Sequence, residues 1–191
     1  SQIYTVKRLD SMAFEWQLKE IELTEKYDLE NYNISQTYSQ ISSYYINTNQ
    51  PEKALEALKK ADATAYSPTQ KISVQLEYVN YYSKFGDMQA AEKILNECKT
   101  AFDQDKRLWS IKKRLYNIEY VYYLQSKQYP KALEAAKKQE AEELNLSESI
   151  QNSVHYLTKG KIYSNMGNMS EAIKYLQMYI EAEDSLKIAN E

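Results

Sequence analysis

The amino-acid sequence predicts an all-α chain, and two features of its composition support this. Only three glycines and three prolines occur among the 191 residues, fewer than the turns of a strand-rich domain need. Long runs such as PEKALEALKKADA and PKALEAAKKQEAEE consist mostly of strong helix formers. The hydrophobic fraction of 43% is sufficient for a packed core, so we expect a folded chain.

An internal repeat organises the predicted helices. Alanine recurs at intervals of 41, 37, 41 and 40 residues, at Ala13, Ala54, Ala91, Ala132 and Ala172. A tyrosine stands nine residues before each of the last four alanines, at Tyr45, Tyr82, Tyr123 and Tyr163. A small alanine lets two helix backbones approach closely, and a tyrosine ring supplies contact area. The spacing predicts helix hairpins in which the four tyrosines are buried at equivalent places.

The expected elements follow from this register. Residues 1–28 are expected to form one helix, the second half of a partial repeat, which carries Ala13. Full hairpins are expected over residues 30–66, 68–103, 105–145 and 147–190, all within a single domain spanning 1–191. The short segments NTNQP, KFGDM, SKQYP and NMGNM are expected to form the turns between paired helices.

The turns contain residues suited to helix ends. Gly86 and Gly167 fit the left-handed residue that follows many helices. Pro51 and Pro130 fit a first helical turn, where no backbone N–H is needed. Ser170 is expected to begin the last helix.

The last hairpin carries a recognisable motif. In HYLTKGKIYSNMGNMSEAIKYLQMYI, Gly160, Tyr163, Gly167 and Ala172 are separated by two, three and four residues. This spacing resembles the tetratricopeptide repeat, a helix–turn–helix unit. The resemblance implies an all-α solenoid, a right-handed α-α superhelix of about four and a half hairpins. The third hairpin departs from the family pattern, because Lys127 replaces the glycine.

Few residues suggest chemistry. His155 is the only histidine and Cys98 the only cysteine, so neither has the partners that a metal site or a catalytic dyad needs. We interpret both as packing residues. The carboxylates lie on polar helix faces, as at Glu142 and Glu143. We therefore expect no enzyme activity, no metal site and no cofactor.

Charge and hydropathy limit the partners. The net charge of −3 gives no reason to expect nucleic-acid binding. We interpret one local group of basic residues as solvated helix surface. It consists of Lys106, Arg107, Lys112, Lys113 and Arg114. No window approaches 18 uninterrupted apolar residues, so we expect no membrane span within this chain.

The resemblance also implies a candidate binding face. In this family the first helices of successive hairpins line a concave surface. That surface is expected to present Gln36, Ser39, Ser43, Asn47, Leu76, Asn80, Lys84, Arg114, Asn117, Val121, Leu124, Val154, Leu157, Lys161 and Asn165. Amides and aliphatic groups of this kind suit an extended peptide or a helix. A simply solvated face is the alternative.

The favoured hypothesis is a non-catalytic module that binds a protein or peptide. The alternative is a domain that senses a small ligand, such as a carbohydrate, in a tyrosine-rich groove. Repeats longer than 34 residues resemble those of bacterial sensory and regulatory proteins, so we expect the input or scaffold region of such a protein. We further expect a fragment of a longer protein with a membrane segment elsewhere, located outside the cytoplasm, with a cytoplasmic location as the alternative.

Overall fold

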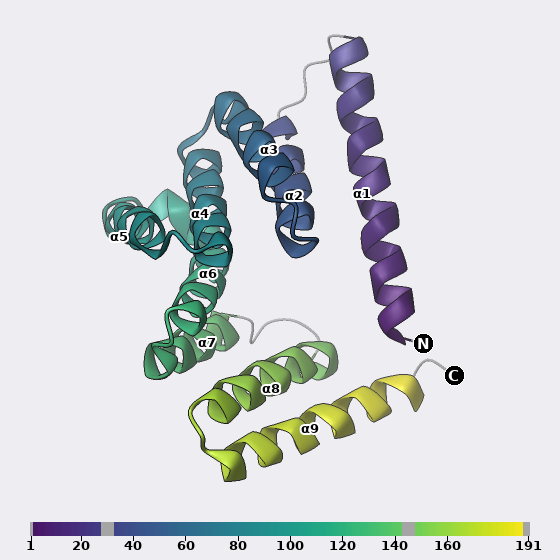
Figure 1. The fold of residues 1–191 in the computed structure, drawn as a ribbon, viewed down its shortest axis with the longest axis vertical. Helices are drawn as coiled ribbons and strands as arrows, with labels where there is room; N and C mark the ends of the chain where they lie inside the picture. Colours follow the sequence, from purple (N-terminus) through teal and green to yellow (C-terminus); the bar gives the residue numbers. More distant parts are fainter. Residues whose placement is uncertain (1, 28–32, 143–147, 189–191) are drawn as a thin grey trace. The chain divides into compact units, whose positions relative to one another are not determined.

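Helices form nearly the whole of the described chain. The computed structural model describes residues 2–27, 33–142 and 148–188 (Figure 1). The α-helices are α1 (Gln2–Lys26), α2 (Ile34–Asn47), α3 (Pro51–Thr64), α4 (Pro68–Phe85), α5 (Met88–Gln104), α6 (Lys112–Gln125), α7 (Tyr129–Glu142), α8 (Glu148–Asn165) and α9 (Met169–Ile188), with a 3-10 helix, η1, at Lys106–Ile111. No strand occurs in the described ranges, which confirms the predicted all-α class. The chain divides into two compact units, Ser1–Leu108 and Trp109–Glu191.

The first unit contains helix α1 and two hairpins. Helices α2 and α3 pair in one hairpin and α4 and α5 in the next, and α4 contacts both helices of the preceding hairpin. Helix α1 lies beside α2 (Figure 1). Helices α1 to α4 share a core made of Ile21, Tyr38, Ile41, Ala57, Ala61, Ala65 and Val74. Contacts with the neighbouring hairpin thus add to the packing within each hairpin, as in other repeat proteins.

The second unit contains the hairpins α6–α7 and α8–α9, and α8 also contacts α7. Its core includes Ala132, Ala136 and Ile162. The two hairpins are joined by an ion pair, in which Lys159 Nζ of α8 donates to Glu140 Oε2 of α7 at 2.6 Å. Because Lys159 is only 8% exposed, this pair is better shielded from water than the surface ion pairs along single helices.

All four hairpin turns use a left-handed residue. Each lies four residues after the repeated tyrosine: Asn49 (φ 59°), Gly86 (φ 98°), Lys127 (φ 59°) and Gly167 (φ 75°). The predictions for Gly86 and Gly167 are confirmed. The third hairpin keeps the same turn although a lysine occupies the position, and a non-glycine residue in this conformation costs about 1–2 kcal/mol.

Helix α9 begins one residue earlier than expected. It starts at Met169, not at Ser170. The side chain of Asn168 accepts the backbone N–H of Glu171 at 3.3 Å. Asn168 therefore serves as the N-cap, because its amide oxygen satisfies one of the free donors of the first turn.

The repeated alanines separate into two groups. Ala54, Ala91 and Ala132 are fully buried and Ala172 is nearly so, as predicted for sites where two helices meet. Ala13 is exposed. Within the described residues, α2 is the principal neighbour of α1.

The repeated tyrosines are half-buried rather than fully buried. This holds for all four: Tyr45, Tyr82, Tyr123 and Tyr163. Lysines lie over two of the rings, with Lys53 Nζ 5.5 Å from the centroid of Tyr45 and Lys131 Nζ 5.5 Å from that of Tyr123. The rings thus lie at the edge of the hairpins, where one part of each ring packs and another part meets solvated cations. In the third hairpin the buried ring is the neighbouring Tyr122.

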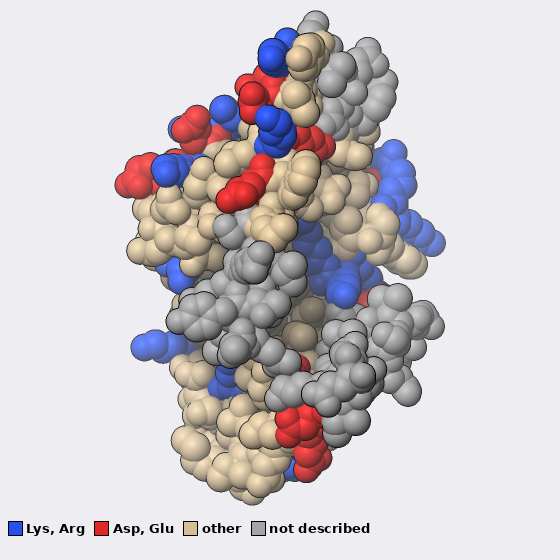
Figure 2. Space-filling model, turned by 90° about the vertical axis from the view of Figure 1, so that its right-hand side faces the viewer, with Lys and Arg blue, Asp and Glu red and all other residues tan. Residues whose placement is uncertain are grey.

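The surface has mixed charge on the face seen in Figure 2. Lysine and arginine side chains are interspersed with aspartate and glutamate there. None of the described helices combines the length and apolar character needed to span a bilayer. Across the described ranges no three His, Cys, Asp or Glu side chains cluster as metal ligands would.

Candidate functional site

The predicted binding face of the first unit is largely used for packing. Ser39 and Leu76 are buried, so they are not available to a ligand, and Ser39 Oγ donates to the backbone oxygen of Ser35. Ser43 Oγ donates to Glu77 Oε1 at 2.6 Å and Asn80 Nδ2 donates to the same oxygen at 2.9 Å. The first bond joins α2 to α4, and the second lies within α4. The polar residues of this face therefore hold two hairpins together, and only Gln36, Asn47 and Lys84 are exposed.

The predicted residues of the second unit are more accessible. Asn117, Val154, Lys161 and Asn165 are exposed, whereas Arg114, Val121, Leu124 and Leu157 are half-buried. Leu124 packs against the core of its unit. Asn165 Nδ2 donates to the backbone oxygen of Lys161 at 2.8 Å. Arg114, Asn117, Val121 and Leu124 belong to α6, and Val154, Leu157, Lys161 and Asn165 belong to α8.

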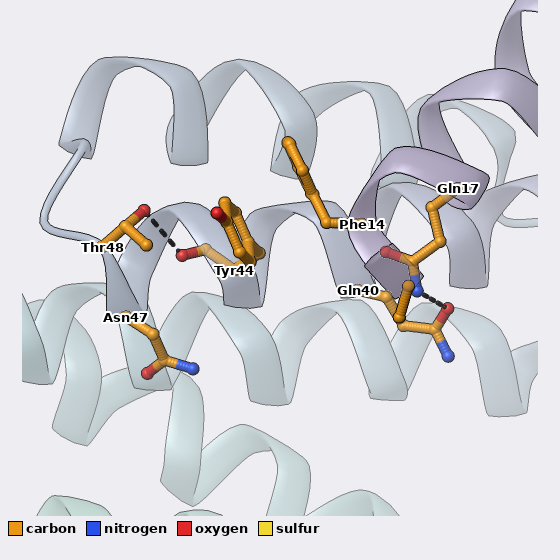
Figure 3. Close-up of a pocket in the computed structure, with 7 residues that line it drawn as sticks. Phe14, Gln17, Gln40, Tyr44, Asn47 and Thr48 are labelled. Carbon is orange, nitrogen blue, oxygen red and sulfur yellow. Dashed lines mark hydrogen bonds between the residues drawn. The ribbon is translucent and has the colours of Figure 1, made fainter. Parts of the chain in front are cut away.

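The structure instead shows a groove between α1 and α2. Its volume is about 720 Å³, and it is lined by Ala13, Phe14 and Gln17 of α1 and by Gln40, Tyr44, Asn47 and Thr48 at α2 (Figure 3). We call this the α1–α2 groove. Most of its lining residues are exposed, including Ala13, Gln40 and Asn47. Of the predicted binding residues, Asn47 alone lines it.

Aromatic rings form the floor of the α1–α2 groove. Phe14 stacks on Tyr44, with ring centroids 3.9 Å apart and ring planes 14° apart. Phe14 also meets Tyr45 edge to face at 5.3 Å. Stacked and edge-to-face pairs of this kind add about 0.5–1.5 kcal/mol beyond burial. They hold α1 against α2 and give the groove an apolar centre.

Polar groups border this apolar centre. Gln17 Nε2 donates to Gln40 Oε1 at 2.8 Å, which joins the two helices at one end (Figure 3). At the other end Thr48 Oγ1 donates to the backbone oxygen of Tyr44 at 2.8 Å. The side chain of Asn47 points away from the aromatic pair in the same view. Amides that are exposed beside an apolar floor can orient a bound backbone or side chain.

A smaller hollow of about 320 Å³ lies where α1, α2 and α3 meet. Tyr38 lines it, and its hydroxyl donates to Glu25 Oε1 at 2.7 Å. Burial of the ring, and secondly this carboxylate acceptor, raise the pKa of Tyr38 to about 12. The bond ties α2 to the C-terminal part of α1, so it helps to fix the width of the α1–α2 groove.

The next hairpin shows what the α1–α2 groove corresponds to. Counted from the repeated tyrosine, Gln40 of α2 is equivalent to Glu77 of α4, and Ala13 of α1 is equivalent to Ala54 of α3. Glu77 is 3% exposed and faces α2, while Ala54 is fully buried. Helix α2 thus covers Ala54 of α3 and Glu77 of α4. The equivalent residues, Ala13 of α1 and Gln40 of α2, are exposed. The groove is the position that a preceding first helix would occupy.

The two side chains that could take part in chemistry, Cys98 and His155, lie outside the α1–α2 groove. Cys98 is buried, and burial raises the pKa of its thiol to about 12, so it is a poor nucleophile. His155 is buried as well. Both therefore have the packing positions that the sequence predicted.

Sequence reasoning missed most of the groove. Phe14, Gln17, Gln40, Tyr44 and Thr48 were absent from the predicted face. The signal in the sequence was limited to Ala13, which fits the repeat register.

Comparison with known proteins gives the family. Residues 5–136, more than half of the chain, match a family model described as 26S proteasome subunit RPN7. The chain belongs to this family. Residues 156–185, within the last hairpin, match a second model described as tetratricopeptide repeat. The resemblance found in that hairpin is therefore confirmed.

Solved structures agree on the fold. The crystal structure of MamA is similar with a TM-score of 0.52 and 19% identity, over 96% of this chain and 94% of that chain. A putative kinesin light chain of Podosopora anserina with nearly identical TPR-like repeats gives a TM-score of 0.51 and 16% identity, over 97% and 92%. At such identities the likeness shows a shared tetratricopeptide-type fold alone. No curated protein sequence matches the chain.

Proposed function

We propose that this chain is a non-catalytic module that binds a protein or peptide segment in the α1–α2 groove. One observation carries the proposal: Ala13 and Gln40 are exposed although their counterparts Ala54 and Glu77 are buried in a helix interface. A surface built like an interface, with an aromatic floor and amide borders, suits a protein ligand.

The family supports a role in protein contacts. Tetratricopeptide repeats generally mediate protein–protein interaction, and folds of this type are generally non-catalytic scaffolds. The name of the RPN7 family describes a subunit of a larger assembly. A protein-binding role for this chain agrees with both.

Photo-cross-linking in the cell of origin tests the proposal. A photoreactive amino acid replaces Gln40 in the groove, and a matched chain carries it at Gln89, an exposed glutamine of α5. We expect one protein to be trapped from position 40 and not from position 89. Tyr44→Ala should reduce the yield, because it removes half of the aromatic floor. Equal trapping from both positions would reject the groove as the binding site.

A carbohydrate ligand is the second candidate. The observation that favours it is the lining itself, in which the rings of Phe14 and Tyr44 lie beside the amides of Gln17 and Gln40. Titration with neutral oligosaccharides, followed by NMR signals of the glutamine and asparagine amides, separates the two candidates. Saturable shifts confined to the groove would favour the sugar.

We also propose that the module is the input or scaffold region of a larger bacterial signalling protein. Its support is the repeat length, with intervals of 37–41 residues between the alanines. The exposed residues of the predicted face, such as Asn117 and Lys161, remain a proposal for a further contact. The complete reading frame of the gene tests the signalling context, which fails if no sensory or output region is encoded.

A further inference from the structure

The smaller hollow of the first unit has the features of a ligand site. It has a volume of about 320 Å³ and lies where α1, α2 and α3 meet, and we call it the three-helix hollow. Its floor is apolar, because Ile21, Ile41 and Ala57, one from each helix, are buried there. Small-molecule sites range from about 300 to 1,000 Å³, so the three-helix hollow suits a ligand with one or two rings.

Two exposed lysines stand at the rim of the three-helix hollow. Lys53 Nζ lies 5.5 Å from the ring centroid of Tyr45, and Lys60 Nζ lies 5.6 Å from that of Tyr38. Lys60 Nζ also lies 3.6 Å from Glu56 Oε1, whereas Lys53 has no carboxylate partner among the described residues. An ammonium group that no carboxylate neutralises, beside an apolar floor, favours an anionic group on an otherwise apolar ligand.

The last hairpin shows what fills the equivalent place. Counted from the repeated alanine, Tyr175 of α9 stands where Ala57 stands in α3. The Tyr175 ring stacks on Tyr163, with centroids 5.5 Å apart and planes 8° apart, and lies 6.4 Å from the ring of Tyr156. Lys159 Nζ lies 5.5 Å from its centroid. The three residues around Tyr175 are equivalent to three that line the three-helix hollow: Tyr45, Tyr38 and Ile41.

The hairpin α4–α5 also carries larger side chains at these positions. Ile94 stands where Ala57 stands in α3, and Tyr78 stands where Ile41 stands in α2. Tyr78 stacks on Tyr82, with ring centroids 6.2 Å apart. The small side chain of Ala57 therefore leaves open in the first hairpin a space that an isoleucine or a tyrosine side chain occupies in two others.

We infer that the three-helix hollow binds a small aromatic carboxylate, a molecule that joins one ring to a carboxylate by a short chain. The ring lies over Ala57 and against Tyr45, as the Tyr175 ring lies against Tyr163 in the last hairpin. The carboxylate accepts a charge-assisted hydrogen bond from Lys53, which lies one helical turn from Ala57 on the same face of α3. The inference goes beyond the proposed protein-binding function, because no residue that lines this hollow lines the α1–α2 groove.

Titration of the complete chain with 3-phenylpropionate tests the inference. Isoleucine and alanine methyl groups are isotopically labelled and followed by NMR. We expect saturable shifts of the methyl signals of Ile21, Ile41 and Ala57, which form the floor. The neutral analogue 3-phenylpropionamide should bind at least about tenfold more weakly, because it offers Lys53 no negative charge. Shifts that stay absent up to the solubility limit of the acid, or equal binding of acid and amide, overturn the inference.

Matched variants locate the carboxylate and the ring. Lys53→Gln removes the charge at the rim, and Lys93→Gln makes the same change at an exposed position of α5. We expect Lys53→Gln to weaken binding of 3-phenylpropionate at least about tenfold and Lys93→Gln to leave it unchanged. Ala57→Ile should abolish binding because it copies the larger residue of α5, with circular dichroism as the check on folding. Equal effects of the two lysine variants overturn the inference whether or not Ala57→Ile folds.

A short peptide that ends in phenylalanine tests the source of the acid, since its C-terminus also joins a ring to a carboxylate. Binding of this peptide at least about tenfold tighter than 3-phenylpropionate would assign the hollow to the end of a protein chain and overturn the small-molecule ligand. Weaker binding of the peptide supports the inference. Trapping of a protein at position 40 is a separate measurement, so failure of the proposed function and failure of this inference are told apart.

Discussion

Replacing Gly160 by alanine tests the closest approach between two helices in the second unit. Gly160 is buried in α8. A Cβ atom added there would lie 2.9 Å from both Cγ and Cδ2 of Leu176 in α9. Carbon atoms at that separation repel strongly, so α9 or the leucine side chain must move outward.

Two opposing effects set the size of the change. Overpacking of this kind costs about 1–3 kcal/mol. Alanine is better than glycine inside a helix by about 1 kcal/mol. The net result is a loss of about 1 kcal/mol in the free energy of unfolding. In a Leu176→Ala background the clash is absent, so the same Gly160→Ala change should stabilise the chain by about 1 kcal/mol.

Urea denaturation followed by circular dichroism measures all four members of this cycle, and hydrogen exchange in α8 and α9 shows whether the loss is local. Gly167→Ala is the matched control. It has a positive φ of 75° and no atom within 4 Å of the added Cβ, so it should cost about 1 kcal/mol in both backgrounds. If Gly160→Ala stabilises the otherwise unchanged chain, the predicted contact between α8 and α9 is refuted.

Three further changes test other contacts. Lys127→Gly should stabilise the chain by about 1 kcal/mol in urea denaturation, since glycine accepts the positive φ of 59° at no steric cost; a loss of stability would contradict the turn. Ala172→Glu should lower the free energy of unfolding by at least about 3 kcal/mol through a buried charge, whereas Ala13→Glu should change it little; equal effects would show that the two sites are alike. Because the pKa of Tyr38 is raised to about 12 by burial and by Glu25, its contribution to stability is complete below pH 10 and is lost as the pH rises towards 12. Tyr38→Phe should remove that alkaline loss in pH-dependent unfolding, and an unchanged profile would exclude this pair as its cause.

The repeat register was predictable because it depends on local requirements. Two helices can cross closely only where a side chain is small, so a regularly spaced alanine marks the crossing. Ala54, Ala91, Ala132 and Ala172 are buried as this reasoning requires. The turn geometry also follows from the register rather than from the residue, since Lys127 adopts the conformation that glycine has in two other hairpins.

The exposure of the candidate binding residues was less predictable, because it depends on how each helix is rotated about its axis. One residue of offset turns a helix face by 100°. The intervals in this chain exceed the common 34-residue period, so positions carried over from the family pattern need not keep the same exposure. Ser39 and Leu76 are buried for this reason, and Ser43 is bound to Glu77 across the hairpins.

The regularly spaced alanine is buried in some repeats and exposed in another. Where the chain supplies a first helix, the alanine is covered, as Ala54 is by Ser42. Where the described chain supplies none, the alanine is exposed, as at Ala13, and the surface around it keeps the shape and chemistry of a helix interface. A repeat position therefore encodes a contact with a helix and does not encode which polypeptide provides it.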